Sequence, residues 1–348
     1  RLEAMTERLY HNLDHIPYTP ALLEARTDTD DLDTNAIYGR RVTVDEVKIR
    51  GKLPTYPGHI NLAVWRMEKK GHEQLRFVSE NCGTSCHMQS TTRQVDRVTE
   101  EIKASFDAHL GPVDIAFLQT LREFKEKATN PVDSFGEHSL GRAAGDYDHD
   151  VTPDSKLSES TFMINLPPSG GFVTSASYTI GNREKTSSIT GVLPTDAETD
   201  YQKLAADVTY TPDEQWTVNF RYRMLELDSD VPSTQTTNGS TTFNDGTIPV
   251  RESIDIDRNN YAAYISYRPS HKTTVKAEFE REVENRSNTG NDDSFSSGGG
   301  DSNLDWALPE EETTDRFRLS FYTRMLAKSA LKFRAWYQHI DVDNPAYG

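Results

Sequence analysis

Cysteine and long apolar runs are both scarce in this sequence. Only two cysteines, Cys82 and Cys86, occur among the 348 residues, which excludes a framework of several disulfides. No stretch approaches the roughly 18 consecutive apolar residues that a membrane-spanning helix requires. The mean hydropathy is −0.71 and 35% of the residues are apolar. Two classes remain: a soluble protein, and a protein that crosses a membrane with strands, in which only alternate residues must be apolar.

Positive charge is also in deficit. The 55 acidic and 38 basic residues give a formal net charge of −17. Nucleic acid is therefore an improbable partner, because its phosphates would be repelled. The sequence also lacks paired carboxylates, a nucleophile elbow and a phosphate-binding loop that would support a hydrolase or a kinase. We expect that the chain is not an enzyme.

What the sequence does contain is strict alternation of apolar and polar residues. In residues 216–224 the apolar positions are Trp216, Val218, Phe220, Tyr222 and Met224. The positions between them are Thr217, Asn219, Arg221 and Arg223. Because successive side chains of a strand point to opposite faces, this segment predicts a strand with one apolar and one polar face. A helix would spread the same residues around its axis.

Segments of this kind recur in pairs joined by short turns rich in Pro, Gly, Ser and Asp. They cover residues 102–110 and 113–117, 162–166 and 172–180, 204–210 and 216–224, 261–267 and 275–279, and 317–321 and 331–337. These are ten predicted strands after residue 100. The other connections are long and polar, roughly 181–203, 226–259 and 283–313. Short turns at one end and long loops at the other are typical of a bacterial outer-membrane barrel.

Side chains near the turns and on the polar face fit the same interpretation. Aromatic residues expected in an interfacial girdle flank the tight turns: Phe172, Tyr210, Trp216 and Tyr267. The polar face carries charges that fit a water-filled lumen or, equally, a solvent-exposed face: Arg221, Arg223, Lys276, Glu278, Arg316, Arg318, Lys332 and Arg334. The alternative is a soluble antiparallel β-sandwich, whose strands also alternate. Short and long connections alternate regularly along the chain. This alternation favours an all-β fold of one kind, namely an antiparallel transmembrane β-barrel or a large part of one.

The pattern is weaker before residue 100. Residues 42–49 predict one irregular strand and residues 60–64 another, joined by a tight connection at 51–58. Residues 1–35 are acidic with few strand signals, so we expect an N-terminal periplasmic or lumenal segment there and the β-barrel over 36–348. The loop-like residues 341–348 follow a predicted strand, which leads us to expect that the natural chain continues.

One motif carries chemistry: Cys82-Gly83-Thr84-Ser85-Cys86-His87, or C-x-x-x-C-H. The usual attachment motif for c-type haem is C-x-x-C-H, in which two thiols bind the haem and the histidine ligates the iron. The extra residue can be accommodated as a bulge between the two thioethers. We predict one covalent haem c, with His87 as the metal ligand. A disulfide, a redox pair and another metal site remain as alternatives.

A haem iron often takes a second axial ligand. The candidates in the sequence are His72, His109, His138, His149 and Met88. The turn pattern places the predicted haem-motif loop, about residues 66–100, and the connection 125–158 at the same end of the barrel. This arrangement favours His138 or His149 as the further cofactor-binding residue.

Three segments around the motif resemble a known family. They are Trp65-Arg66-Met67-Glu68-Lys69-Lys70-Gly71, Leu75-Arg76-Phe77 and Thr91-Thr92-Arg93-Gln94-Val95-Asp96. They are similar to the decahaem-associated outer-membrane proteins of the MtrB/PioB type, the porin components of porin–cytochrome conduits. The resemblance implies a barrel in the bacterial outer membrane that sheathes a multihaem c-type cytochrome and supports extracellular electron transfer between periplasmic and extracellular carriers.

Two features depart from that family. Its barrels have more strands than the ten to twelve expected here, and the C-x-x-x-C-H motif implies a haem that a sheath does not require. Two other functions stay open: a diffusion porin with a Cys82–Cys86 disulfide, and a soluble β-rich binding protein.

Overall fold

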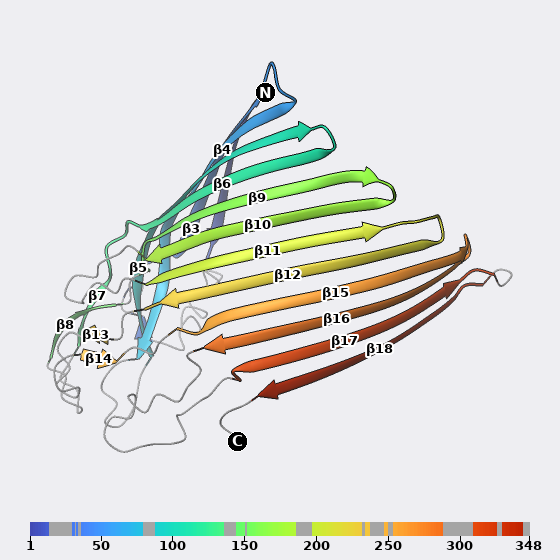
Figure 1. Ribbon diagram of the computed structural model, residues 1–348. Helices are drawn as coiled ribbons and strands as arrows, with labels where there is room; N and C mark the ends of the chain where they lie inside the picture. The colour runs from blue at the N-terminus through green and yellow to red at the C-terminus, as the bar shows by residue number, and fades with distance from the viewer. Residues whose placement is uncertain are drawn as a thin grey trace.

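The computed structural model describes residues 1–13, 30–31, 33, 36–78, 88–135, 144–149, 152–185, 197–231, 234–236, 247–249, 253–287, 309–325 and 329–343. Within these ranges the regular structure is entirely β-strand, as predicted. Thirteen strands follow one another in a single antiparallel path, each paired with the next (Figure 1). No helix in the described ranges is long and apolar enough to cross a membrane.

The strands of the path, in spatial order, are β1 (Leu2–Asn12), β3 (Gly39–Lys52), β4 (Gly58–Val78), β5 (Met88–Leu110), β6 (Val113–Glu126), β9 (Ser155–Ser169), β10 (Phe172–Lys185), β11 (Glu198–Tyr210), β12 (Trp216–Asp230), β15 (Asp255–Ser270), β16 (Thr273–Ser287), β17 (Glu311–Thr323) and β18 (Leu331–Asp343). The short strand β2 (Asp30–Asp31) pairs with β5 in parallel. Two small hairpins lie outside the main sheet: β7 (Val132–Phe135) with β8 (Gly145–Asp148), and β13 (Thr234–Thr236) with β14 (Thr247–Pro249).

The register places the apolar residues of neighbouring strands side by side. Phe220 of β12 pairs with Val208 of β11 and with Ala263 of β15. Across the same face, Ala263 pairs with Phe279 of β16, which pairs with Phe317 of β17. We call this face the apolar face and the opposite one the polar face. The apolar alternation found in the sequence is therefore continuous across the sheet.

The apolar face is exposed rather than covered. Its exposed large side chains include Leu62, Ile102, Leu121, Phe162, Ile164, Val218, Phe220, Ile265, Phe317, Leu319 and Phe333. Among the described residues only five apolar side chains are buried, against ten polar or charged ones. A water-soluble sandwich would bury its apolar rows between two sheets. This sheet presents them outward, as a barrel in lipid does.

The apolar face also has the height that a bilayer requires. On β12 it runs from Trp216 to Met224, and Glu226 and Asp228 follow on the same face. Nine residues of strand match the roughly 9–11 that cross a bilayer. Aromatic side chains close this band beside the tight turns: Phe172 stacks on Tyr210 at 4.2 Å and Trp216 on Tyr267 at 4.3 Å between ring centroids. The predicted girdle residues thus lie together at one edge of the band.

Tight turns and longer connections lie at opposite ends of the strands (Figure 1). Residues 111–112, 170–171 and 271–272 alone join β5 to β6, β9 to β10 and β15 to β16. Gly170 and Gly171 have φ of 57° and 83°, a left-handed conformation that glycine adopts without strain. A Cβ on Gly171 would overlap the backbone oxygen of Thr211. The turn therefore needs glycine for space as well as for conformation.

At the end away from the tight turns, the strands are longer than predicted. The expected haem-motif loop at 66–100 is wrong for most of its length, because β4 continues to Val78 and β5 begins at Met88. Likewise β10 extends to Lys185 and β12 to Asp230, into regions predicted as loops. The reason is that pairing continues beyond the apolar band, where both faces are polar and the alternation that marks a strand is lost.

Residues 1–35 also hold a strand that the sequence signals did not reveal. All eleven residues of β1 pair with β3, from Leu2 opposite Ile49 to Asn12 opposite Gly39. The boundary at residue 36 therefore does not separate the sheet from a segment without strands. The signal is hidden because apolar residues fall on both faces: Leu2 and Tyr10 on one, Met5 and Leu9 on the other. Residues 42–49 and 60–64 do form strands, as expected.

The β7–β8 hairpin lies against the end of β4. Phe77 of β4 makes an edge-on contact with Phe135 of β7, with ring centroids 5.7 Å apart. Phe77 belongs to the polar face, since its strand neighbours on that face include Glu73 and Leu75. The β7–β8 hairpin therefore lies over the polar face, close to the end of β4.

A charge on the apolar face should destabilise the protein far more than the same charge on the polar face. We expect Phe220→Lys to lower the free energy of unfolding in lipid vesicles by about 2–4 kcal/mol, because Phe220 lies at mid-height of the band. Urea titration of vesicle-embedded protein measures it. The matched control is Asn219→Lys, on the next residue and the other face, which should cost much less; equal losses would refute the two-faced arrangement.

Removing the Phe77 ring should loosen the β7–β8 hairpin without affecting the sheet. We expect Phe77→Ala to speed amide exchange in residues 132–135 and 145–148 by about three- to tenfold, since an aromatic pair contributes about 0.5–1.5 kcal/mol. Hydrogen exchange read by mass spectrometry measures it. Leu62→Ala, on the apolar face of the same strand, is the control and should leave the hairpin unchanged. Unaltered hairpin exchange in Phe77→Ala would show that the contact does not hold it.

Candidate functional site

The polar face carries ion pairs that join neighbouring strands. Glu101 of β5 lies opposite Arg122 of β6, whose Nε is 2.8 Å from the carboxylate. Glu278 and Glu280 of β16 bind Arg318 and Arg316 of β17 at 2.7 and 3.1 Å. Further pairs on this face are Arg97 with Glu126, Arg223 with Asp207, and Arg258 with Glu284. The charges predicted for a lumen therefore do share one face, and four of the eight, Arg223, Glu278, Arg316 and Arg318, are paired across strands.

This ladder of charges is partly shielded from solvent. Glu101 is 7% exposed and Glu284 is 8% exposed, although both are ionisable. Neighbouring hydroxyl and amide groups extend the network: Tyr201 donates to Glu159 at 2.8 Å and Asn260 to Glu280 at 2.8 Å. A buried carboxylate is tolerated when cations and donors surround it. The polar face is therefore a polar surface with fixed charges and a defined geometry.

The haem motif, Cys82 to His87, lies outside the described residues, as does His138. The residues on either side of the motif segment are placed: Val78 pairs with Met88 at the end of the β4–β5 hairpin. The motif is thus carried on the nine residues that connect two long paired strands, 79–87. Within the described part of the chain, no cluster of His, Cys, Asp and Glu has the arrangement of a metal site.

His149 lies near the end of β4. Its ring is 4.7 Å from the ring of Phe77, which precedes the motif segment. The prediction that residues 66–100 and 125–158 meet at one end is confirmed by this contact. However, Nε2 of His149 lies 2.6 Å from Oδ2 of Asp133, and both side chains are largely buried. Iron binding through this nitrogen would require that pair to open.

Three other candidates can be compared by position. His109 is at the tight-turn end of β5, beside Asp114, roughly 70 Å along the strand from Met88 at about 3.3 Å per residue. It is therefore remote from the motif segment. His72 lies on the apolar face of β4, whereas Phe77 lies on the polar face. Met88 adjoins the motif directly in the sequence.

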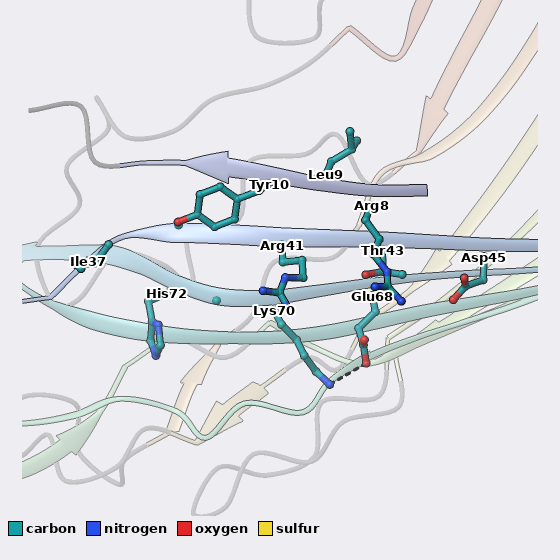
Figure 2. Close-up of a pocket in the computed structure, with 12 residues that line it drawn as sticks. Arg8, Leu9, Tyr10, Ile37, Arg41, Thr43, Asp45, Glu68, Lys70 and His72 are labelled. Atoms are coloured by element: carbon teal, nitrogen blue, oxygen red, sulfur yellow. Dashed lines mark ion pairs between the residues drawn. The ribbon is translucent and has the colours of Figure 1, made fainter. Parts of the chain in front are cut away.

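His72 lines a groove of about 820 Å³ between β1, β3 and β4 (Figure 2). The groove continues the apolar face beyond its apolar band, and charged side chains line it: Arg8, Arg41, Asp45, Glu68 and Lys70. Lys70 Nζ is 2.9 Å from Glu68, and the hydrogen bond that it donates lowers the pKa of the Glu68 carboxyl. No pattern in the sequence indicates this groove, because only the register brings residues of β1 and β4 to one side.

Several solved structures of outer-membrane proteins are similar to this chain, with TM-scores below 0.5. The chain resembles the ferric-catecholate import receptor Fiu of E. coli K12 (11% identity, TM-score 0.45), covering 99% of this chain and 55% of that one. It resembles the ferric yersiniabactin uptake receptor FyuA of Yersinia pestis (10% identity, TM-score 0.43), covering 99% of this chain and 57% of that one. It also resembles the outer-membrane protein OmpT of Vibrio cholerae (8% identity, TM-score 0.31), covering 97% of this chain and 98% of that one. The chain thus spans just over half the length of the two receptors.

A comparison with curated proteins gave no match. Residues 173–344, by contrast, match the family described as outer membrane beta-barrel porin, MtrB/PioB. This match covers β10 to β18 and is separate from the segments around the haem motif that carry the sequence resemblance. Residues 173–344 of this chain thus match the MtrB/PioB type of bacterial outer-membrane β-barrel porin.

Proposed function

We propose that this chain is the sheath of a porin–cytochrome conduit: a barrel that holds a multihaem c-type cytochrome across the outer membrane for extracellular electron transfer. The observation that carries the proposal is the exposed apolar face backed by a charged polar face in a chain that matches the MtrB/PioB family over residues 173–344. On this proposal the chain catalyses no reaction of its own.

The physical need for such a sheath follows from the bilayer. Its hydrocarbon core is about 30 Å thick, and a cytochrome cannot expose its polar backbone and charges there. The apolar face of this sheet contacts the lipid instead of the cytochrome. The polar face, with pairs such as Arg223–Asp207 at 2.7 Å, offers hydrogen-bonding and charged groups to a protein partner inside.

We further propose that Cys82 and Cys86 attach one haem c and that His87 ligates its iron. Two thiols followed directly by a histidine are the donor set that such a haem requires. When bound, the haem would supply one more electron carrier at the end of the conduit where β4 and β5 end. His149, held by Asp133 against Phe77, and His138 remain the proposed second ligands.

Spectroscopy of the detergent-solubilised full chain tests the haem. We expect a c-type haem spectrum and a haem stain that survives denaturing electrophoresis, because the thioethers are covalent. The variant Cys82→Ser/Cys86→Ser should lose both signals, whereas His87→Ala should keep the stain and change the spectrum. His149→Ala and His138→Ala, compared with each other, identify the second ligand. A colourless protein with a Cys82–Cys86 disulfide would contradict the haem proposal.

Reconstitution tests the sheath separately. An affinity-tagged chain should retain a multihaem cytochrome through purification, and vesicles containing both should pass electrons from an external reductant to an enclosed acceptor. Vesicles with the chain alone are the control and should not. A chain that purifies without any cytochrome and conducts ions steadily in planar bilayers would instead be a diffusion porin.

A further inference from the structure

A row of cations and hydroxyls crosses five strands on the polar face, near the tight turns. The register pairs Thr217 of β12 with Ser266 of β15, and Ser266 with Lys276 of β16. It then pairs Lys276 with Ser320 of β17, and Ser320 with Arg334 of β18. The next row towards the turns adds Lys332 of β18, opposite Tyr322. We call Ser266, Lys276, Ser320, Lys332 and Arg334 the basic cluster.

The basic cluster contains no carboxylate. Elsewhere on this face, cations such as Arg316 and Arg318 bind a glutamate on the neighbouring strand. Lys276, Lys332 and Arg334 make no ion pair with any described residue. The nearest acidic side chain along β16 on this face is Glu278, which already binds Arg318 at 2.7 Å. No carboxylate of the described residues therefore neutralises the positive charges of these three side chains.

A second, independent observation concerns Ser266. Its side chain is 4% exposed, and its Oγ has no hydrogen-bond partner. A buried hydroxyl without a partner costs roughly 1–3 kcal/mol. Ser266 stands directly opposite Lys276, so an oxygen atom held by Lys276 would supply the acceptor that this hydroxyl lacks.

The spacing suits a small oxyanion. Lys276 and Arg334 are separated by the single strand β17, so their backbones are roughly 10 Å apart at about 4.8 Å per strand. Long flexible side chains can close on one anion across that gap. The hydroxyl of Ser320 lies between them and can donate to the same ligand. Arginine and lysine with hydroxyl donors are the usual partners of phosphate and carboxylate oxygens.

We propose that the basic cluster is an oxyanion-binding site, for a phosphate or carboxylate group, inside the barrel at its tight-turn end. The site rests on the register and on Ser266, and it does not depend on the cytochrome proposal. In a barrel whose short turns face the periplasm, it lies where an anion entering from that side is first met.

Trp336 provides a local probe. It lies two residues beyond Arg334 on the same face of β18 and is 75% exposed. Its fluorescence can be isolated in the full chain, in detergent, by subtracting the signal of Trp336→Phe. Iodide, an anionic quencher, should gather at the cluster, whereas neutral acrylamide should not. Their two quenching constants therefore separate local positive charge from simple exposure.

We expect Lys276→Gln/Arg334→Gln to lower iodide quenching of Trp336 by at least about twofold and to leave acrylamide quenching unchanged. The charge-matched control is Lys103→Gln/Lys203→Gln, two lysines on the polar face of other strands, which should change neither. An equal loss in the control would overturn the proposal, because the effect would then reflect the charge of the whole face.

Competition identifies the ligand class. At constant ionic strength, sodium phosphate or sodium succinate should suppress iodide quenching more than sodium chloride does. The more effective of the two shows whether phosphate or carboxylate is preferred. Ser266→Ala should weaken this competition by about tenfold, as expected for a lost hydrogen bond to a charged group. If neither oxyanion competes better than chloride, or if Ser266→Ala competes as the wild type does, the site as described is refuted.

Discussion

Every backbone amide that crosses hydrocarbon must find its hydrogen-bond partner within the protein. An antiparallel sheet meets this requirement by pairing each strand with two neighbours, and eleven of the thirteen strands of the path are paired on both sides. β1 and β18 each have one neighbour in the described sheet, so their outer edges must also be paired before the sheet can stand in a bilayer. Continuous pairing, rather than core packing, is thus the constraint that shapes this molecule.

That constraint frees the two faces to differ. Because the backbone is satisfied in the plane of the sheet, one face can consist of apolar side chains such as Phe220 and Phe317, and the other of Glu–Arg pairs such as Glu280–Arg316. The same register that aligns the apolar residues also aligns the charges. The charge ladder, the groove at His72 and the basic cluster are all products of register, since each combines residues from different strands.

Much of the fold was predictable where one face meets lipid. Phe162, Ile164 and Leu166 alternate with polar residues and form part of β9, because the bilayer imposes that alternation. Past the band, at Glu226 and Asp228 of β12, no such constraint acts, and strand and loop have the same polar composition. β1 was missed because Met5 and Tyr10 lie on opposite faces. Ser266 and Arg334 give no sign of proximity in the sequence, since only pairing through β16 and β17 joins them.

The most direct test of the two-faced sheet is residue-by-residue accessibility along β12 in lipid vesicles. Single cysteines at positions 217–224, in a variant lacking Cys82 and Cys86, would carry spin labels probed with oxygen and with a water-soluble nickel chelate. Labels replacing Val218, Phe220 and Tyr222 should collide with oxygen, and labels replacing Asn219, Arg221 and Arg223 should collide with nickel. Equal accessibility at neighbouring positions, or nickel contact at every position, would contradict the account.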